Sequence, residues 1–344
     1  MKENTRDIKV SVIIPVFNRQ EFLAEAIESV LAQDMTEIEI IIVNDGSTDQ
    51  SAKVAQEFVA NDNRMVYLEQ ENQGVSVARN KGMSLAKGEY LYFLDSDDTL
   101  GSEFLSSSYQ LATTNNLDVL VCGAYYADRF PNVMALPTCA KFLKKSFLDK
   151  HPDVQFLKGI QPGEDGIFSH ELLALTDKVG LNLKANYFYR QHEGQNTSQI
   201  IKQTEKIIQA IPIWLKELEA FYERYNLWDK KALHLARFIE HEPFEFRYMA
   251  MPFQQEQKQQ LFQLIRDFMD SKVLPRLTEK DRSMLSAAFI GFLQAGSADE
   301  FDAWYQARKL RNRAKVKALY LVSKLLPSRK WKNSFRAKMK KKYD

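Results

Sequence analysis

Residues 10–17 read VSVIIPVF, a run whose apolar, mostly β-branched side chains fall on both faces of a strand. Strands that are buried on both faces are typical of parallel sheets covered by helices. An amphipathic stretch at 21–33 follows this run and predicts a helix. The alternation of apolar strand and helix continues to residue 126. The sequence therefore predicts an α/β fold with a mostly parallel sheet and helices on both faces.

Further strands are predicted at 38–43, 65–70, 89–94 and 118–126, and further helices at 47–60 (with a Ser/Thr cap), 74–88 and 102–115. The pattern over 130–200 is less regular, with a loop, a helix and one or two strands. After about Gln199, long helices replace the alternation. We expect an α/β domain over 1–200, divided into 8–130 and 131–200, a helical domain over 201–307, and a tail over 308–344.

Three carboxylates follow the strand at 89–94, in the sequence DSDD at 95–98. Like charges this close repel one another, so a compensating charge is expected. Carboxylate oxygens suit Mg²⁺ or Mn²⁺, which can also bridge the phosphates of a nucleotide. In isolation, the cluster fits a solvated cap for the next helix equally well.

Other polar side chains stand where the neighbouring strands end. Asn18 follows the first strand, and Asp45 follows the second in VNDGSTD. Ligands bind at the carboxyl ends of the strands in such sheets. Arg79, in ENQGVSVARNKG, precedes the DSDD strand and could pair with a phosphate or orient Asp95. The alternative for Arg79 is a surface position on an amphipathic helix.

Together these motifs resemble glycosyltransferase family 2, the inverting, nucleotide-sugar-dependent enzymes with the Rossmann-like GT-A fold. The resemblance rests on SVIIPVFNRQEFLAEAIESVLAQ, EIIIVNDGSTD, ENQGVSVARNKG, GEYLYFLDSDD and GEDGIF, which occur in the order and spacing typical of that family. It covers roughly residues 8–200. Because five ordered motifs take part, the match is far more specific than any one of them.

The resemblance implies a nucleotide-sugar site made of Pro15, Val16, Asn18, Asp45, Arg79, Asp95, Ser96 and Arg190. Within it, Asp45 would contact the uracil and Asp95 the ribose. Asp97 would hold the Mn²⁺ or Mg²⁺ that bridges the diphosphate, and His192 in YFYRQHEG is the candidate second metal ligand. His192 could equally be a solvated or structural residue.

The GED motif supplies the candidate catalytic residues. By resemblance, Asp165 would be the general base, and Glu164 would contact the acceptor or orient the site. Inverting transfer needs one base to take the proton of the attacking hydroxyl. Taken alone, GED also fits an acidic first turn of a helix, which the helix dipole favours.

The expected function is metal-assisted transfer of a sugar from a UDP-sugar to a hydroxyl of a glycan or lipid-linked acceptor. Two alternatives keep the fold: nucleotidyl transfer, and non-catalytic binding of nucleotide or glycan. Nucleotidyltransferases need a Gly-rich loop after the first strand, where this chain has PVFNRQEF. A non-catalytic protein would be expected to lose the acidic residues, which are all present.

Charge is distributed unevenly along the chain. Residues 308–344 hold 15 Lys or Arg against one acid, so this tail carries +14 and residues 1–307 carry −12. We expect two short helices broken at Pro327, the first with Leu310, Ala314, Ala318, Leu321, Val322 and Leu325 on one stripe, the second with Trp331, Phe335 and Met339. A cationic amphipathic helix suits an anionic membrane surface. The rival readings are packing on the helical domain or a protein partner, and nucleic-acid binding, which we do not expect.

Localisation follows from weaker signals. The two cysteines, Cys122 and Cys139, fit a reducing compartment, and the polar N-terminus MKENTRDIK has no signal-peptide core. No window approaches 18 uncharged apolar residues. We expect a cytoplasmic protein, with peripheral attachment to the inner face of the cell membrane through the tail. The helical region could shape an acceptor groove, brace the α/β domain or support a homo-oligomer.

Overall fold

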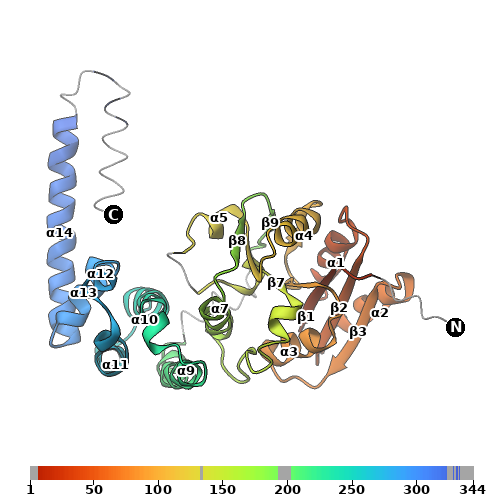
Figure 1. Cartoon of the computed structure of the whole chain (residues 1–344), viewed down its shortest axis with the longest axis horizontal. Helices are drawn as coiled ribbons and strands as arrows, with labels where there is room; N and C mark the ends of the chain where they lie inside the picture. The colour runs from red at the N-terminus through yellow and green to blue at the C-terminus, as the bar shows by residue number, and fades with distance from the viewer. Residues whose placement is uncertain are drawn as a thin grey trace.

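The computed structural model describes residues 7–131, 135–192, 203–323 and the single residues 328, 331 and 333. Its centre is a seven-stranded sheet in the order β3-β2-β1-β4-β7-β6-β8 (Figure 1). All neighbouring strands are parallel except β7, which runs antiparallel to both β4 and β6. The strands are β1 Val10–Val16, β2 Ile38–Asp45, β3 Met65–Gln70, β4 Tyr90–Phe93, β6 Val119–Cys122, β7 Lys141–Lys144 and β8 Val179–Asn182.

Helices pack on both faces of this sheet, as the alternation predicted. In β1, Val12 and Ile14 pack in one apolar cluster with α1 and α4, whereas Ile13 packs in the other with α3 and α7. The helices are α1 Leu23–Leu31, α2 Ser51–Asn61, α3 Val75–Leu85, α4 Phe104–Thr114, α5 Ala124–Ala127, α6 Lys145–Leu148 and α7 Glu164–Leu175, with a 3-10 turn, η1, at Thr138–Ala140. The predicted α/β class with a mostly parallel sheet is confirmed.

Three details differ from the prediction. The strand expected at 118–126 ends at Cys122, because Gly123 has a φ of 90° and starts the short helix α5. The helix expected from residue 47 begins only at Ser51, because Ser47 and Thr48 bond to Asn18 and do not cap it. Strand β7 was not predicted, since its sequence KFLK gives a short and partly charged apolar signal.

A small two-stranded ribbon stands beside the main sheet. Strand β5 (Thr99–Leu100) pairs antiparallel with β9 (Tyr187–Phe188). This pairing brings the segment after the acidic cluster next to the segment that precedes His192. Residues far apart in the sequence thereby meet at one edge of the sheet.

After residue 203, the described chain consists of helices joined by short turns, as predicted. Its elements are α9 Thr204–Arg224, α10 Trp228–Ile239, the π-helical η2 Glu240–Met249, α11 Gln255–Phe268, the short η3 Met269–Val273 and η4 Leu274–Arg276, α12 Glu279–Arg282, α13 Ala287–Gln294 and α14 Ala298–Ser323. One apolar cluster runs without a break from Leu91 in the sheet through Trp214 in α9 to Phe292 in α13. The helical region and one face of the sheet therefore share a core.

Helix α14 extends away from the other helices (Figure 1). It continues through residues 307 and 308 without interruption. Leu310 is 64% exposed and Ala314 and Ala318 are also exposed, so the rival reading, in which this stripe packs on the helical domain, is wrong at these three positions. The expected second helix and its break at Pro327 lie outside the described residues, apart from Ser328, Trp331 and Asn333.

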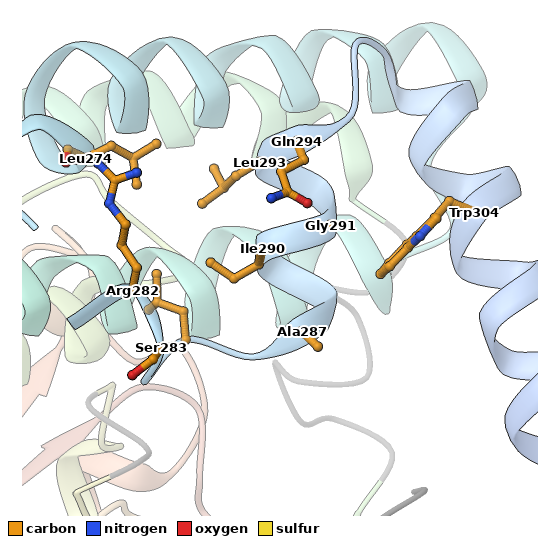
Figure 2. Close-up of a pocket in the computed structure, with 10 residues that line it drawn as sticks. Leu274, Arg282, Ser283, Ala287, Ile290, Gly291, Leu293, Gln294 and Trp304 are labelled. Carbon is orange, nitrogen blue, oxygen red and sulfur yellow. Dashed lines mark hydrogen bonds between the residues drawn. The ribbon is translucent and has the colours of Figure 1, made fainter. Parts of the chain in front are cut away.

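A pocket of about 520 Å³ lies at the base of α14. Figure 2 shows Trp304 of α14 on one side, Ile290 and Leu293 of α13 in the middle, and Arg282 at the other end. The pocket contains none of the residues predicted for the functional site. Among the described helices, none combines the length and the apolar character needed to span a bilayer.

Candidate active site

The ends of β1 and β2 are tied together by side-chain bonds to backbone. Asn18, in the left-handed conformation with a φ of 51°, donates its backbone N–H to Ser47 Oγ at 3.0 Å. Its Oδ1 accepts from the backbone N–H of Thr48 at 2.8 Å. Pro15 and Val16 lie in β1 beside Val43 and Asn44, and both are buried. The predicted nucleoside segment is thus fixed in place.

Asp45 is buried at the end of β2 and faces the turn before α3. Its carboxylate accepts from Gln70 Nε2 at 2.7 Å and from the backbone N–H groups of Gln73 and Gly74 at 2.9 and 2.8 Å. A carboxylate has about four acceptor sites, so these three bonds leave roughly one. Asp45 both anchors the start of α3 and keeps some capacity to accept.

Arg79 connects two motifs that the sequence analysis treated separately. Its guanidinium donates from Nη2 to Asp95 Oδ1 at 3.1 Å and from Nη1 to Glu164 Oε1 at 3.3 Å. Arg79 is 6% exposed and lies over the Phe156 ring, so the surface alternative for this residue is wrong. The strand-end acid cluster and the GED turn therefore meet at one buried cation.

Asp97 is contacted by two residues that lie far apart in the sequence. Its Oδ2 accepts from Arg19 Nε at 3.1 Å and lies 2.9 Å from His192 Nε2. The His192 ring packs against Phe22 at 4.6 Å between centroids. Sequence reasoning missed Arg19, although it directly follows Asn18 in the PVFNR motif. The protein itself thus supplies positive charge to the acidic cluster at Arg19 and Arg79.

Asp98 has a role different from that of the other acids in the cluster. It is buried and accepts from the Tyr187 hydroxyl and, at 2.7 Å, from the backbone N–H of Arg190. Burial raises the pKa of Asp98 to about 6, against the lowering effect of these hydrogen bonds. Asp98 therefore fastens β9 to the acidic cluster.

Arg190 and Ser96 lie beside these acids. The Arg190 guanidinium donates from Nε to the Asp97 carbonyl at 3.0 Å, contacts Glu25 and lies over Phe22. It thus links the segment after β9 to α1. Ser96 is 6% exposed, between Asp95 and Asp97.

The GED turn starts α7 and rests on the helical region. Gly163 has a φ of 107°, and a Cβ there would lie 2.4 Å from Trp214 Cζ2. Glu164 is buried, and burial together with Asp165 raises its pKa to about 7 in spite of Arg79. Asp165 is only partly buried, and its Oδ1 accepts from the backbone N–H of Gly166 at 2.9 Å. The two adjacent acids therefore have different environments.

The remaining histidines are placed by packing. His170 and His234 stack at 4.3 Å, and His170 Nε2 lies 3.1 Å from the Tyr222 hydroxyl. His241 lies beside Glu245. Within the part of the chain that the structure describes, no three His, Cys, Asp or Glu side chains are grouped so as to hold a metal ion. Cys122 is buried beside Ser108.

Comparison with known proteins places these observations in a wider context. Residues 11–171 match the family model described as Glycosyl transferase family 2. Glycosyltransferase GlyA of Streptococcus pneumoniae serotype 4 is 40% identical over 251 residues, which cover 64% of this chain and 35% of GlyA. The chain spans about a third of the length of the curated relatives it matches.

Two solved structures share the fold. S. aureus TarS 1-349, in complex with UDP-GlcNAc, has a TM-score of 0.69 and 19% identity, covering 87% of this chain and 92% of that one. The mannosyltransferase PcManGT from Pyrobaculum calidifontis, in complex with GDP-Man and Mn²⁺, has a TM-score of 0.52 and 13% identity, covering 81% and 83%. The fold expected from the sequence resemblance is thereby confirmed.

Proposed function

We propose that the protein transfers a sugar from a UDP-sugar to a hydroxyl of a glycan or a lipid-linked acceptor, with inversion, on the premise that residues 11–171 match the model of glycosyl transferase family 2. One observation carries the proposal. Arg79 binds both Asp95 of the strand-end cluster and Glu164 of the GED turn, although Glu164 follows Arg79 by 85 residues in the sequence. A donor bound at the strand-end cluster would therefore lie next to a base in the GED turn.

Asp165 is the proposed general base. Glu164 is nine-tenths buried and paired with Arg79, so its side chain is committed to the protein. Asp165 is partly exposed and has, among its described side-chain contacts, only the N–H of its own helix turn. It would take the proton of the acceptor hydroxyl as the hydroxyl oxygen bonds to the sugar's anomeric carbon and the bond to the diphosphate breaks. Attack opposite the leaving group inverts that carbon.

The donor is proposed to be a uridine nucleotide. Asp45 has one acceptor position left, which suits the N–H of a uracil ring. Asn18, Pro15 and Val16 border it from the neighbouring strand end, and Asp95 and Ser96 would face the ribose. TarS, which has the same fold, was solved with UDP-GlcNAc. The sugar itself is left open by these contacts.

A divalent cation, Mn²⁺ or Mg²⁺, is proposed to be held by Asp97 and His192. A carboxylate and an imidazole are acceptable ligands, and such ions usually complete their shell with substrate phosphates and water. The fit has one condition: Arg19 shares Asp97 Oδ2 and would have to leave that oxygen or stay beside the metal. When bound, the ion would stabilise negative charge on the leaving diphosphate. Arg79 would remain paired with Asp95 and Glu164.

The test is a hydrolysis screen of UDP- and GDP-sugars with Mn²⁺, because slow hydrolysis of the donor uses water in place of the unidentified acceptor. Release of UDP from one UDP-sugar, with no turnover of GDP-sugars, is the expected result. A preference for GDP-sugars would overturn the donor assignment. Formation of a nucleotide-sugar from a sugar phosphate and UTP would instead favour nucleotidyl transfer.

Attachment to an anionic membrane surface through α14 is the second part of the proposal. Arg308, Lys309, Arg311, Arg313, Lys315 and Lys317 follow one another along this helix without an acid between them. Among the described residues, no ion pair neutralises any of the six. The exposed Leu310 and Tyr320 lie on the same helix and could enter the headgroup layer. This position suits an enzyme whose acceptor is linked to lipid.

A further inference from the structure

Lys141, in strand β7, is a lysine with no exposure to solvent. Its ammonium Nζ donates to the carbonyl of Leu136 at 2.8 Å and to the carbonyl of Asp165 at 3.3 Å. It also lies over the Phe168 ring at 5.8 Å. Among the described residues, no carboxylate lies within ion-pair distance of this nitrogen. Lys141 is therefore bound to backbone rather than to an acidic side chain.

Burial of an ammonium group costs desolvation free energy, which its interactions in the protein must offset. Burial lowers the pKa of Lys141 to about 8, with Asp165 acting in the opposite direction. An apolar residue of similar length would fill the same space without this cost. Only a hydrogen-bond donor, however, can bond to both of these carbonyls.

Those two carbonyls belong to segments that flank the proposed base. Leu136 lies in the loop before η1, which leads into β7, and Asp165 lies in the first turn of α7. Ser169 joins the same segments a second time, because its Oγ accepts from the Leu136 N–H at 2.9 Å and donates to the Gly166 carbonyl at 3.1 Å. Lys141 is thus the charged member of a cross-link that holds the Asp165 backbone.

We propose that Lys141 is a positioning residue, which fixes the direction of the Asp165 side chain by binding the carbonyl of the same residue. The inference rests on the proposed role of Asp165 as general base. Lys141 touches neither donor nor acceptor in this scheme. Its loss changes how often the base is aligned for proton transfer and leaves donor binding unchanged.

The experiment compares K141M, S169A and K144M with the wild-type protein. Lys144 is the matched control, because it lies on the same strand and donates to Asn116 away from the site. Hydrolysis of UDP-GlcNAc, UDP-glucose and UDP-galactose with Mn²⁺ gives kcat and KM, and calorimetric titration with UDP counts the folded sites. Misplacing a catalytic group by about 1 Å can cost about 100-fold in rate. We expect K141M to lose at least about tenfold in kcat, with KM unchanged and S169A losing less.

The outcomes separate this inference from the proposed function. Wild-type kcat in K141M, or equal losses in K141M and K144M, would overturn the role of Lys141 alone. Loss of UDP binding together with kcat in K141M would show a merely structural lysine. If K141M does not fold, the S169A variant tests the cross-link instead. A wild-type kcat in S169A would contradict the proposal. Absence of turnover by the wild-type protein with every donor would remove the proposed function, and this inference with it.

Discussion

Arg79 Nη1, on α3, lies 3.3 Å from Glu164 Oε1, although Glu164 is the first residue of a different helix, α7. Both side chains are at least nine-tenths buried. The contact makes the environment of the GED turn depend on a residue 85 positions earlier in the sequence. Asp165, the neighbouring acid, is only partly buried.

Replacing Arg79 by methionine is expected to destabilise the fold and to abolish donor hydrolysis. Removal of one member of a buried ion pair costs about 3–5 kcal/mol, because it leaves the other charge unpaired. Urea unfolding of R79M measures the loss, and R79M/E164Q is expected to recover part of it. The control is R64M, whose more exposed pair with Asp62 is worth about 1 kcal/mol or less. Equal losses in R79M and R64M would contradict the prediction.

Asp97 and Asp165 are expected to act in different steps. Asp97→Ala removes a proposed metal ligand, so UDP binding should no longer strengthen when Mn²⁺ is added. Asp165→Asn keeps the shape of the base but removes its ability to take a proton, so UDP binding should persist while hydrolysis is lost. Calorimetric titration of both variants with UDP, with and without Mn²⁺, separates the two roles. Equal loss of binding in both would refute the assignment.

Gly163 is expected to tolerate no side chain. Its positive φ costs an alanine about 1–2 kcal/mol, and the new Cβ would also lie 2.4 Å from Trp214 Cζ2. Gly159 offers a matched comparison, because it has a φ of 74° with no neighbouring atom within 4 Å of the added Cβ. G163A should therefore lose hydrolysis and about 1–3 kcal/mol more stability than G159A. Similar melting temperatures and activities would show that the contact with Trp214 is unimportant.

Glu171 is expected to make the protein less stable as pH rises. Burial raises the pKa of Glu171 in α7 to about 8 from an ordinary 4.5, although Arg224 opposes this. Because the folded state binds this proton more tightly, the stability present below pH 4.5 is lost as the pH rises through 8. E171Q stays neutral, so its advantage over wild type should widen between pH 5 and 8.5 in thermal melts. E57Q, at an exposed position, is the control. A difference in melting temperature between E171Q and wild type that stays constant from pH 5 to 8.5 would contradict this prediction.

Helix α14 is expected to bind anionic vesicles. Each basic residue near such a surface contributes about 1 kcal/mol, so replacing Arg311, Arg313, Lys315 and Lys317 by glutamine should weaken binding by about 100-fold or more. Sedimentation with vesicles containing phosphatidylglycerol measures this, and added salt should weaken wild-type binding. A control variant changes Lys81, Lys87, Lys178 and Lys184 instead. Equal binding by both variants would show that α14 is not the attachment site.

Much of the α/β fold could be predicted because its signals are local. The run at β1 and the amphipathic stretch at α1 each specify their own element, and chain topology then brings the strand ends to one edge. Asp45 and Asp95 could be placed at that edge for the same reason. The ion pair of Arg79 with Asp95 was anticipated because their segments are adjacent in sequence.

The contacts that distinguish the acids from one another could not be predicted. Arg19 reaches Asp97 across 78 positions of sequence, and Trp214 reaches Gly163 from the helical region. Lys141 carries no motif, and its burial follows from the antiparallel insertion of β7 between two other strands. Such meetings depend on how elements pack, which residue spacing does not record.

The contact between Gly163 and Trp214 also bears on any attempt to shorten the protein. A fragment ending near residue 200 would keep the whole sheet, the acid cluster and Arg79. It would lack the Trp214 indole, against which Gly163 packs. Such a fragment would also expose the apolar face of the sheet that shares its core with the helical region, so it would be expected to lose stability as well as the support of the GED turn. Excision experiments on this chain would accordingly do better to preserve α9.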